Sequence, residues 1–413
     1  MPAINTYTSM NAMLKDSWSK YIAKLIPEEN MLQREMNFRY VEDLGGRYIL
    51  PLVTRVAQGY SFHTPGSAQN LSQVVSPTYP RMIVDAPGLT LRDRVTYEMM
   101  RRAGNDTYYK NEVEPVLEGL KVSHVGLCES MLLYGQATNG WGTVNAAGVI
   151  NATTLQITAS EWALGLWIDR LGAFFDIYRA GLLIKTVQLN SFQPSLRRIV
   201  VDSTVGIADG DVIRPNGASL AAGNEIKGVH AILTEATSQF GVPIATEPLL
   251  QGSSVALGGN PLTFARVLNA VSQASFFGFQ GKGLLICNPL AYRDLIDEME
   301  GARNFGGDQY NVQKMNRGVE MLQFNGPKGS VTIYGHPKVK EGFAYGLVMN
   351  TWEKVGVAEI TLQSTVNMNG KSDFFLFPLQ DANAYEMRTY SQYSVVCRKP
   401  AANFIITGIT NSP

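Results

Sequence analysis

Residues 47–57 have the sequence RYILPLVTRVA, and residues 82–95 have the sequence MIVDAPGLTLRDRV. Both stretches are rich in apolar and β-branched residues, which predicts two long strands of one hairpin. Residues 58–80 between them are rich in Gly, Ser, Pro, Gln and Asn and are expected to form its tip. An isolated two-stranded hairpin is marginally stable in water. The hairpin must therefore pack on another surface. If that surface belongs to a second copy of the chain, the protein is a unit of an assembly.

The composition sets limits on size and partners. A chain of 413 residues suggests two or three domains. Its charged fraction of 17% is below the usual value of about 25%, which leaves more neutral surface to bury against partners. Lys plus Arg equals Asp plus Glu, so the net charge is +0. A dedicated nucleic-acid-binding protein has a basic balance, so any contact with nucleic acid is expected to be local.

The cysteines and the apolar segments indicate where the protein folds. Cys128, Cys287 and Cys397 are too far apart in sequence to suggest a disulfide framework or a zinc site, and we expect them to be buried in a reducing compartment. The polar N-terminal residues lack the apolar core of a signal peptide. No uninterrupted apolar run approaches the ~18 residues of a membrane span. We therefore expect a protein made in a cytoplasm, with no membrane partner.

Two helices are predicted on either side of the hairpin. An amphipathic helix is expected at about residues 9–26, where Leu14, Trp18, Ile22 and Leu25 share one side and Pro27 ends it. This apolar side can cover the chain's own core or a neighbouring copy. The longest helix is expected at about residues 106–134, with apolar residues at steps of three and four. Pro115 could move its start further along the chain.

The rest of the chain divides into a β-rich part and a mixed part. Between residues 141 and 237, short β-type runs alternate with turns, which predicts a small inserted barrel or sandwich with Trp162 and Trp167 in its core. From about Pro243 onward, strands and helices alternate, and residues 301–310 (GARNFGGDQY) are expected to form a Gly-rich loop. A long strand at residues 385–397 and a last strand at residues 403–409 close the chain.

No recognisable catalytic motif or metal-binding spacing is present. The fragments nearest to a phosphate-binding loop, Gly281-Lys282-Gly283 and residues 326–330 (GPKGS), lack the required spacing, and the second is better explained as a hairpin turn. The four histidines are isolated, without a second His or Cys at ligand spacing. The acidic run DSTVGIADGD at residues 202–211 lacks the spacing of a calcium loop, so we expect a turn between strands. Triads are spatial, so these absences do not exclude an enzyme.

Taken together, the order of segments resembles the major capsid proteins of tailed bacteriophages, which have the Hong Kong 97-type (Johnson) fold. Four stretches resemble parts of that fold. GGRYILPLVTRVAQGYSFHTPG resembles the extended loop, and NEVEPVLEGLKVSHVGLCESMLLYG resembles the spine helix of the peripheral domain. GLLICNPLAYRDLIDEM with GSVTIYGHPKVKEGFAYGLVMNTWEKV resembles the axial domain. DANAYEMRTYSQYSVVCRKPAANFIITGI resembles the segment that closes the peripheral domain.

The resemblance implies an α+β fold with five parts. These are an N-terminal arm (1–37), an extended loop (38–95), a peripheral domain (96–140 and 365–413), an inserted β subdomain (141–237) and an axial domain (238–364).

The resemblance also implies a structural protein without a cofactor. Copies would form pentamers and hexamers and then an icosahedral shell around double-stranded DNA, located in the virion after assembly in the host cytoplasm. Partners would be other copies of the chain, a portal protein, a decoration protein in some members, and DNA bound without sequence specificity.

Two departures from some family members lead to further expectations. Some members carry an N-terminal scaffolding segment that is removed by proteolysis, whereas here the first predicted helix begins within about ten residues of Met1. We therefore expect a separate scaffolding protein and no large maturation cleavage. Some members join subunits covalently through a lysine of the extended loop. No lysine occurs between Lys24 and Lys110, so we expect no such isopeptide bond and intact subunit bands in detergent.

Contacts between subunits, rather than catalysis, are assigned to specific residues. We expect them from the N-terminal helix, the tip of the extended loop, the polar face of its second strand and the Gly-rich loop: Leu14, Trp18, Ile22, Leu25, Tyr60, Phe62, His63, Arg92, Arg94, Arg303, Asp308 and Tyr310. No catalytic, cofactor or metal residue is assigned.

Two alternative functions remain open. A nanocompartment shell protein of the encapsulin type has the same fold, but the β insertion and the long loop tip fit a virus better. A cytosolic multi-domain enzyme should show titratable residues clustered near a Gly-rich loop. Gly306-Gly307-Asp308 is the only candidate for such a cluster.

Overall fold

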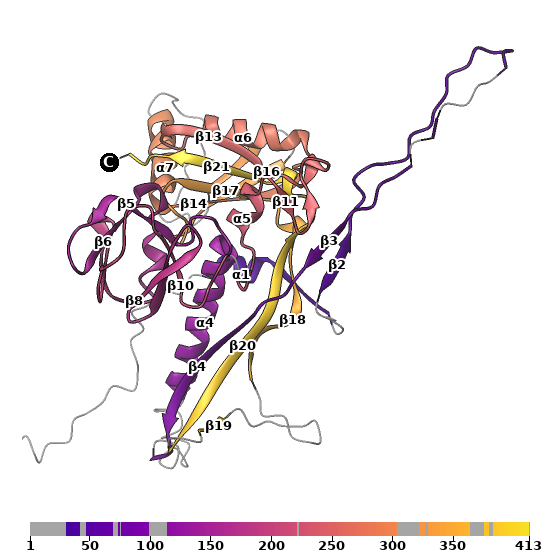
Figure 1. Cartoon of the computed structure of the whole chain (residues 1–413). Helices are drawn as coiled ribbons and strands as arrows, with labels where there is room; N and C mark the ends of the chain where they lie inside the picture. The colour runs from indigo at the N-terminus through magenta and orange to yellow at the C-terminus, as the bar shows by residue number, and fades with distance from the viewer. Residues whose placement is uncertain are drawn as a thin grey trace, which may run out of the picture.

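The computed structural model shows a body built around two sheets, a barrel and a long helix, with a thin projection leaving one side (Figure 1). The residues that it describes are 30–41, 47–68, 73–74, 76–98, 114–220, 223–303, 322–326, 329–363, 376–379 and 383–412. The predicted N-terminal helix at residues 9–26 lies outside this part of the chain.

The first sheet joins segments from both ends of the chain. Its strands are β1 (Asn37–Tyr40), β18 (Trp352–Leu362), β20 (Ala384–Cys397) and β19 (Leu376–Pro378), in that order, with β4 (Gly88–Thr96) also paired to β20. The β4–β20 ladder is antiparallel and runs from Ala384 opposite Thr96 to Gln392 opposite Gly88. Helix α4 (Glu114–Tyr134) packs along these two strands, where Val95, Leu120 and Met387 form a buried cluster.

The second sheet forms the part of the body beside the C-terminus. Its order is β13 (Ser253–Asn260), β21 (Phe404–Ile409), β17 (Phe343–Leu347), β14 (Gly281–Cys287), β16 (Gly329–Gly335) and β15 (Leu322–Gly326). Helices α6 (Phe264–Phe276) and α7 (Pro289–Arg303) accompany it, and apolar side chains of both join its core. Gly326 pairs with Gly329 between antiparallel β15 and β16, which confirms the hairpin predicted from GPKGS.

The β-rich region forms a closed barrel. Its strands, in order around the barrel, are β10 (Val212–Pro215), β5 (Gly142–Val149), β6 (Thr154–Ile157), β9 (Arg198–Val201), β8 (Leu182–Gln193) and β7 (Phe174–Arg179). Trp162 and Trp167 are buried and stacked, as predicted for its core. The strands predicted in this region are confirmed, while the division of the chain into five parts stays a prediction.

Several short elements are also present in the part of the chain that the structure describes. They are α1 (Met31–Glu35), α5 (Val229–Thr234), the pairs β2 (Tyr48–Pro51) with β3 (Arg81–Val84) and β11 (Ser238–Gln239) with β12 (Val242–Pro243), and 3-10 turns at Ala159–Glu161, Leu164–Leu166, Pro194–Leu196, Pro248–Leu250, Met349–Thr351 and Pro400–Ala402.

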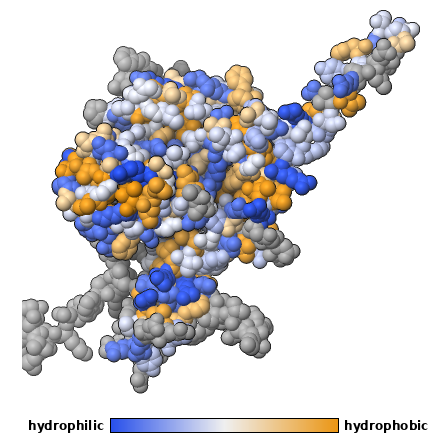
Figure 2. All heavy atoms as spheres, in the orientation of Figure 1, coloured by the Kyte–Doolittle hydropathy of each residue, from blue (hydrophilic) through white to orange (hydrophobic). Residues whose placement is uncertain are grey.

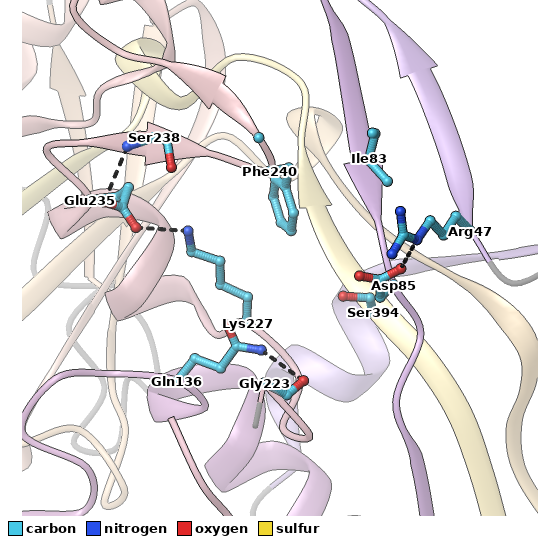
Figure 3. A pocket seen from close by; sticks show the side chains of 11 residues that line it. Arg47, Ile83, Asp85, Gln136, Gly223, Lys227, Glu235, Ser238, Phe240 and Ser394 are labelled. Atoms are coloured by element: carbon cyan, nitrogen blue, oxygen red, sulfur yellow. Dashed lines mark hydrogen bonds and ion pairs between the residues drawn. The ribbon is translucent and has the colours of Figure 1, made fainter. Parts of the chain in front are cut away.

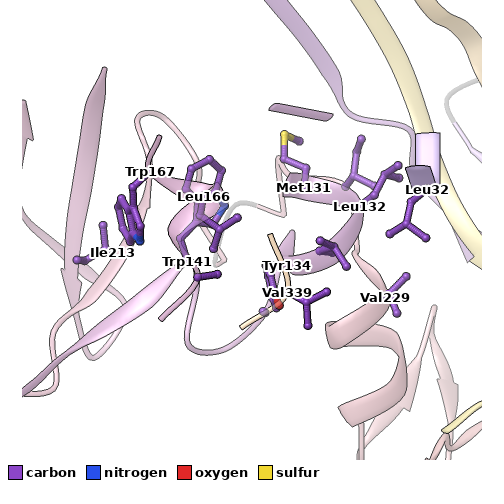
Figure 4. Packing of buried hydrophobic residues seen from close by; sticks show 14 of the residues in the cluster. Leu32, Met131, Leu132, Tyr134, Trp141, Leu166, Trp167, Ile213, Val229 and Val339 are labelled. Carbon is purple, nitrogen blue, oxygen red and sulfur yellow. The ribbon is translucent and has the colours of Figure 1, made fainter. Parts of the chain in front are cut away.

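One continuous hydrophobic core connects the barrel to the helices (Figure 4). Trp167 and Ile213 of the barrel lie at one end of the view, Tyr134 of α4 in the middle, and Leu32 of α1 at the other end. Because the core has no break at the barrel boundary, the barrel is anchored to the body by buried side chains. All three cysteines are buried and free, as the sequence predicted.

The predicted hairpin is wrong in two respects. Its second strand is divided: β3 pairs with β2, whereas β4 pairs with β20, with Pro87 in between. Its first strand was predicted to reach residue 57, but regular pairing ends at Pro51. Prolines cannot donate to a ladder, so Pro51 and Pro80 weaken the ribbon, and an isolated bridge joins Arg55 to Thr78 beyond them. The alternation of residues 89–95 is confirmed, since Val95 is buried and Arg92 and Arg94 are exposed.

The ends of two helices can be compared with the sequence prediction. The described part of helix α4 begins at Glu114 and is about 30 Å long. The predicted start, at residues 106–113, lies outside the described residues. Residues 301–303, predicted as the start of a Gly-rich loop, are the last turn of α7. The rest of that loop lies outside the described residues.

A close contact at Gly346 gives a first test of this packing. A Cβ atom added there would lie 2.0 Å from Cζ of the fully buried Phe404. We expect Gly346→Ala to lower the free energy of unfolding by about 1–3 kcal/mol, measured from the urea midpoint of the isolated subunit. Gly119→Ala is the control, because nothing lies within 4 Å of its Cβ position and alanine stabilises an exposed helical site. Equal midpoints for the two variants would contradict this packing.

Candidate functional site

The projection from the body is the feature that most requires a partner. We define the ribbon as residues 48–84, which comprise β2, β3 and the chain between them. Its root is held by the body: Met82 and Val84 are buried beside Val242, and the N–H of Ile83 donates to the Phe240 carbonyl at 3.0 Å. The root is therefore a docked β-ribbon of defined register.

Beyond its root the ribbon leaves the body (Figure 1). Large apolar side chains along it are exposed: Val53, Val56, Tyr60, Phe62, Val74 and Tyr79. Phe62 is 93% exposed, and its ring contact is with Tyr60 at a centroid distance of 5.7 Å. Exposed apolar surface of this kind marks a binding surface.

The charge of the ribbon is one-sided. Residues 48–84 contain Arg55, Arg81 and His63 but no Asp, Glu or Lys. The Arg55 guanidinium donates to the Thr246 carbonyl at 3.4 Å and so belongs to the root. Apart from His63, the tip carries only apolar and uncharged polar side chains, which suits a surface that becomes buried against protein.

A hollow lies beside the root of the ribbon (Figure 3). Its charged side chains form two ion pairs, Arg47 with Asp85 at 3.3 Å and Lys227 with Glu235 at 3.0 Å. The Lys227 ammonium also lies 5.3 Å from the centre of the Phe240 ring. Each of these four charges is therefore neutralised by a partner within the hollow.

The other predicted contact residues fall in three places. Arg92 and Arg94 lie on the exposed face of β4, 3.8 Å and 3.5 Å from the buried Glu386 carboxylate. A hydrogen bond from Arg388 lowers the pKa of Glu386, which keeps this carboxylate charged. Arg303 is the last residue of α7. The remaining ones, Leu14, Trp18, Ile22, Leu25, Asp308 and Tyr310, lie outside the described residues, and all contacts between copies stay predictions.

A buried polar network joins α4 to the body, and sequence analysis did not find it. The Glu129 carboxylate accepts from the N–H groups of Leu32 and Gln33, each at 2.8 Å, and lies 3.1 Å from Nε2 of His336. The Lys338 ammonium donates to the Gly126 carbonyl at 2.7 Å. No sequence signal could reveal this network, because its partners are about 100 to 200 residues apart.

The acidic turn at residues 202–211 has a structural role. Asp209 accepts from the N–H of Ala147 at 2.8 Å, and Asp211 forms a bidentate pair with Arg179 at 2.7 Å and 2.8 Å. The prediction of a turn between strands is confirmed, since this stretch connects β9 to β10. Among the residues that the structure describes, no group of three His, Cys, Asp or Glu side chains is placed to hold a metal ion.

Three of the four histidines are buried in the structure, whereas His63 is exposed on the ribbon. The His124 ring lies between the hydroxyls of Thr389 and Ser391, both at 2.8 Å, and joins α4 to β20. Burial lowers the pKa of His124 to about 4 and that of His230 to about 3.

These lowered pKa values predict acid sensitivity. In the unfolded chain both histidines titrate near their ordinary pKa of about 6.5. Below that pH the unfolded chain gains protons that the folded chain does not, so the free energy of unfolding should fall between about pH 6.5 and about pH 4. Urea unfolding across this range measures the slope. His124→Asn should reduce it by up to about 1.4 kcal/mol per pH unit, and an unchanged slope would contradict the assignment.

Comparison with known proteins finds similar structures but no similar sequence. The sequence matches no family model and no curated protein. The structure is similar to the solved "Cyanophage A-1(L) capsid asymmetric unit", with a TM-score of 0.58 and 9% identity, over 98% of this chain and 100% of that chain. It is also similar to a chain of Mycobacterium phage Adephagia, with a TM-score of 0.50, 8% identity and full coverage of both chains. The predicted resemblance to phage capsid proteins is confirmed at the level of the fold.

Proposed function

We propose that this chain is the major capsid protein of a tailed bacteriophage, and that copies assemble through pentamers and hexamers into an icosahedral shell around double-stranded DNA. The observation that carries the proposal is the ribbon, whose exposed apolar tip has a use only when a second molecule covers it. The likeness of the fold to a chain of a cyanophage capsid supports it along the whole length.

The energetics of the ribbon favour assembly over catalysis. Burying a Val or Phe side chain stabilises by about 1.5–3 kcal/mol. Six exposed apolar side chains on each ribbon therefore offer a large gain that is realised only between molecules. A shell multiplies this gain, because every copy both gives a ribbon and receives one.

The charge distribution fits a container better than a specific nucleic-acid reader. The net charge is +0, so DNA would be held without sequence specificity by local contacts. In the part of the chain described here, no helix is long and apolar enough to cross a membrane. We infer that the protein resides in the virion capsid, is assembled in the host cytoplasm and has no enzymatic activity or cofactor.

Partners follow from the same proposal. We expect a separate scaffolding protein during assembly, a portal protein at one vertex and, in mature particles, a decoration protein as an optional addition. The absence of lysine from residues 25–109 predicts that shells carry no isopeptide bond through the ribbon. Boiling purified shells in detergent should therefore release single subunits of 45.3 kDa.

The decisive experiment is negative-stain electron microscopy of the purified protein beside its size-exclusion profile. Closed shells, tubes or ring-shaped capsomers are the expected result, and nucleic acid inside the particles would identify a virus capsid. Enzyme cargo in place of nucleic acid would identify a nanocompartment. Monomers or dimers that persist at high concentration, with and without coexpressed phage scaffolding protein, would overturn the proposal.

A further inference from the structure

The barrel has one end joined to the body and one end free. The chain enters it at Trp141 and leaves it after Pro215, and these positions adjoin, since the N–H of Trp141 donates to the Ile213 carbonyl at 2.9 Å. Strand pairing then places three turns at the opposite end, residues 145–153, 179–184 and 202–211. We call this opposite end the free end of the barrel.

The free end carries a patch of exposed apolar side chains from all three turns. Its members are Val149, Ile150, Leu182, Leu183, Ile184 and Val205. Leu182 is 71% exposed and Val205 is 75% exposed, which is unusual for large aliphatic residues at loop ends. Figure 2 shows hydrophobic residues gathered over the barrel side of the body.

The patch is preformed. The Arg179 guanidinium donates to the Gly206 carbonyl at 3.0 Å, and the Thr204 hydroxyl donates to the Asn151 carbonyl at 2.7 Å, so the three turns are tied together. Ala180 and Gly181 both have positive φ, 49° and 82°, which makes the tight turn that presents Leu182. A rigid apolar surface loses little conformational entropy when it binds.

The rest of the barrel is fixed to the body, so the free end has a fixed direction. The N–H of Gly165 donates to the Pro337 carbonyl at 3.1 Å, and the N–H of Glu341 donates to the Trp162 carbonyl at 2.9 Å. Arg197 pairs with Glu341 at 2.9 Å. The barrel therefore moves with the body, and it lies on the side of the body away from the ribbon (Figure 1).

The ribbon of a second copy matches this patch in position, polarity and charge. Ribbon and barrel lie on opposite sides of the body, so a contact between them joins copies head to tail, the kind of contact that forms a ring when its rotation closes. The ribbon tip is apolar, as is the patch. Exposed Asp202 and Asp209 flank the patch, while residues 48–84 contain no acidic side chain that would repel them.

We propose that the free end of the barrel is the docking surface for the ribbon of an adjacent copy. This inference rests on the proposed function, since it concerns how copies meet within a shell. It assigns the barrel to contacts between subunits, with Phe62 of one copy lying against Leu182 and Val205 of the next.

Cysteine crosslinking in intact shells tests the contact. The three native cysteines are buried, so introduced cysteines are the reactive ones. We expect shells of the Phe62→Cys/Leu182→Cys variant, treated with a short bismaleimide, to give a ladder of covalent multimers in denaturing gels. Each single variant should give single subunits. The comparison variant Phe62→Cys/Phe276→Cys uses a second strongly exposed phenylalanine, 87% exposed at the end of α6, and should also give single subunits.

A second variant tests whether assembly needs the patch. Leu182→Asp/Leu183→Asp should leave the far-ultraviolet circular dichroism of the subunit unchanged and abolish closed shells, because both side chains are exposed in the subunit. Normal shells from this variant would overturn the docking site. So would a covalent ladder from the Phe62→Cys/Phe276→Cys variant, or the absence of a ladder from both crosslinking variants. These results would leave the proposed function standing, whereas failure of the parent chain to form shells would contradict both.

Discussion

Deletion of residues 59–78 is expected to abolish closed shells while leaving a folded, soluble subunit. The deleted segment holds Tyr60, Phe62 and Val74, whose side chains are exposed in the subunit. The contacts that fix the root remain, because Met82, Val84 and the Ile83–Phe240 hydrogen bond lie outside the deletion. The deletion should therefore prevent association between subunits without affecting the folding of the subunit. Thermal unfolding, size-exclusion chromatography and electron microscopy of the same preparation measure both.

A matched pair of point variants tests whether assembly requires an apolar side chain at the tip of the ribbon or only a ribbon of full length. Phe62→Leu keeps an apolar side chain at a position that is 93% exposed in the subunit, and shells should persist. Phe62→Asp would place a charge in the buried contact, with a cost of several kcal/mol for each copy, and should prevent closure. Normal shells from the deletion variant would show that the ribbon is dispensable and would remove the main support for the proposed function.

Replacement of Glu129 by Ala is expected to have the largest effect on stability. The carboxylate is fully buried, accepts two backbone hydrogen bonds from α1 and contacts His336. Its removal leaves buried donors without a partner, and each buried donor left unsatisfied costs about 1–3 kcal/mol. The urea midpoint of the subunit measures the loss.

Hydrogen exchange adds a local readout for the same variant. The amide protons of Leu32 and Gln33 should exchange much faster in Glu129→Ala, because both lose their acceptor. Glu129→Gln should be intermediate, since one amide oxygen still accepts. Arg34→Ala on the same short helix is the control: its pair with Glu35 is exposed, and such pairs contribute about 0–1 kcal/mol. Unchanged exchange in α1 after loss of Glu129 would show that the carboxylate does not hold this segment.

Local pattern predicted the elements whose stability depends on nearby residues. The three- and four-residue spacing of α4, the alternation of β4 and the short strands of the barrel all appear in the structure, because each places apolar side chains on one face. The prediction of a single hairpin failed because strand propensity does not specify which strand a segment pairs with. Residues 82–84 pair with β2 while residues 88–96 pair with β20, nearly 300 positions later. The longer ladder and the apolar cluster with Leu120 and Met387 decided that pairing.

By itself the sequence determined the order of elements, the buried cysteines and tryptophans, and a ribbon with an apolar tip free of acidic residues. These features follow from side-chain chemistry at short range. Only the tertiary structure decided that Glu129 meets Leu32 and His336, and that three separate turns form one apolar end on the barrel. Such contacts join residues far apart in sequence, and they exist because closing the barrel and docking it on α4 bury more apolar surface than any local arrangement could.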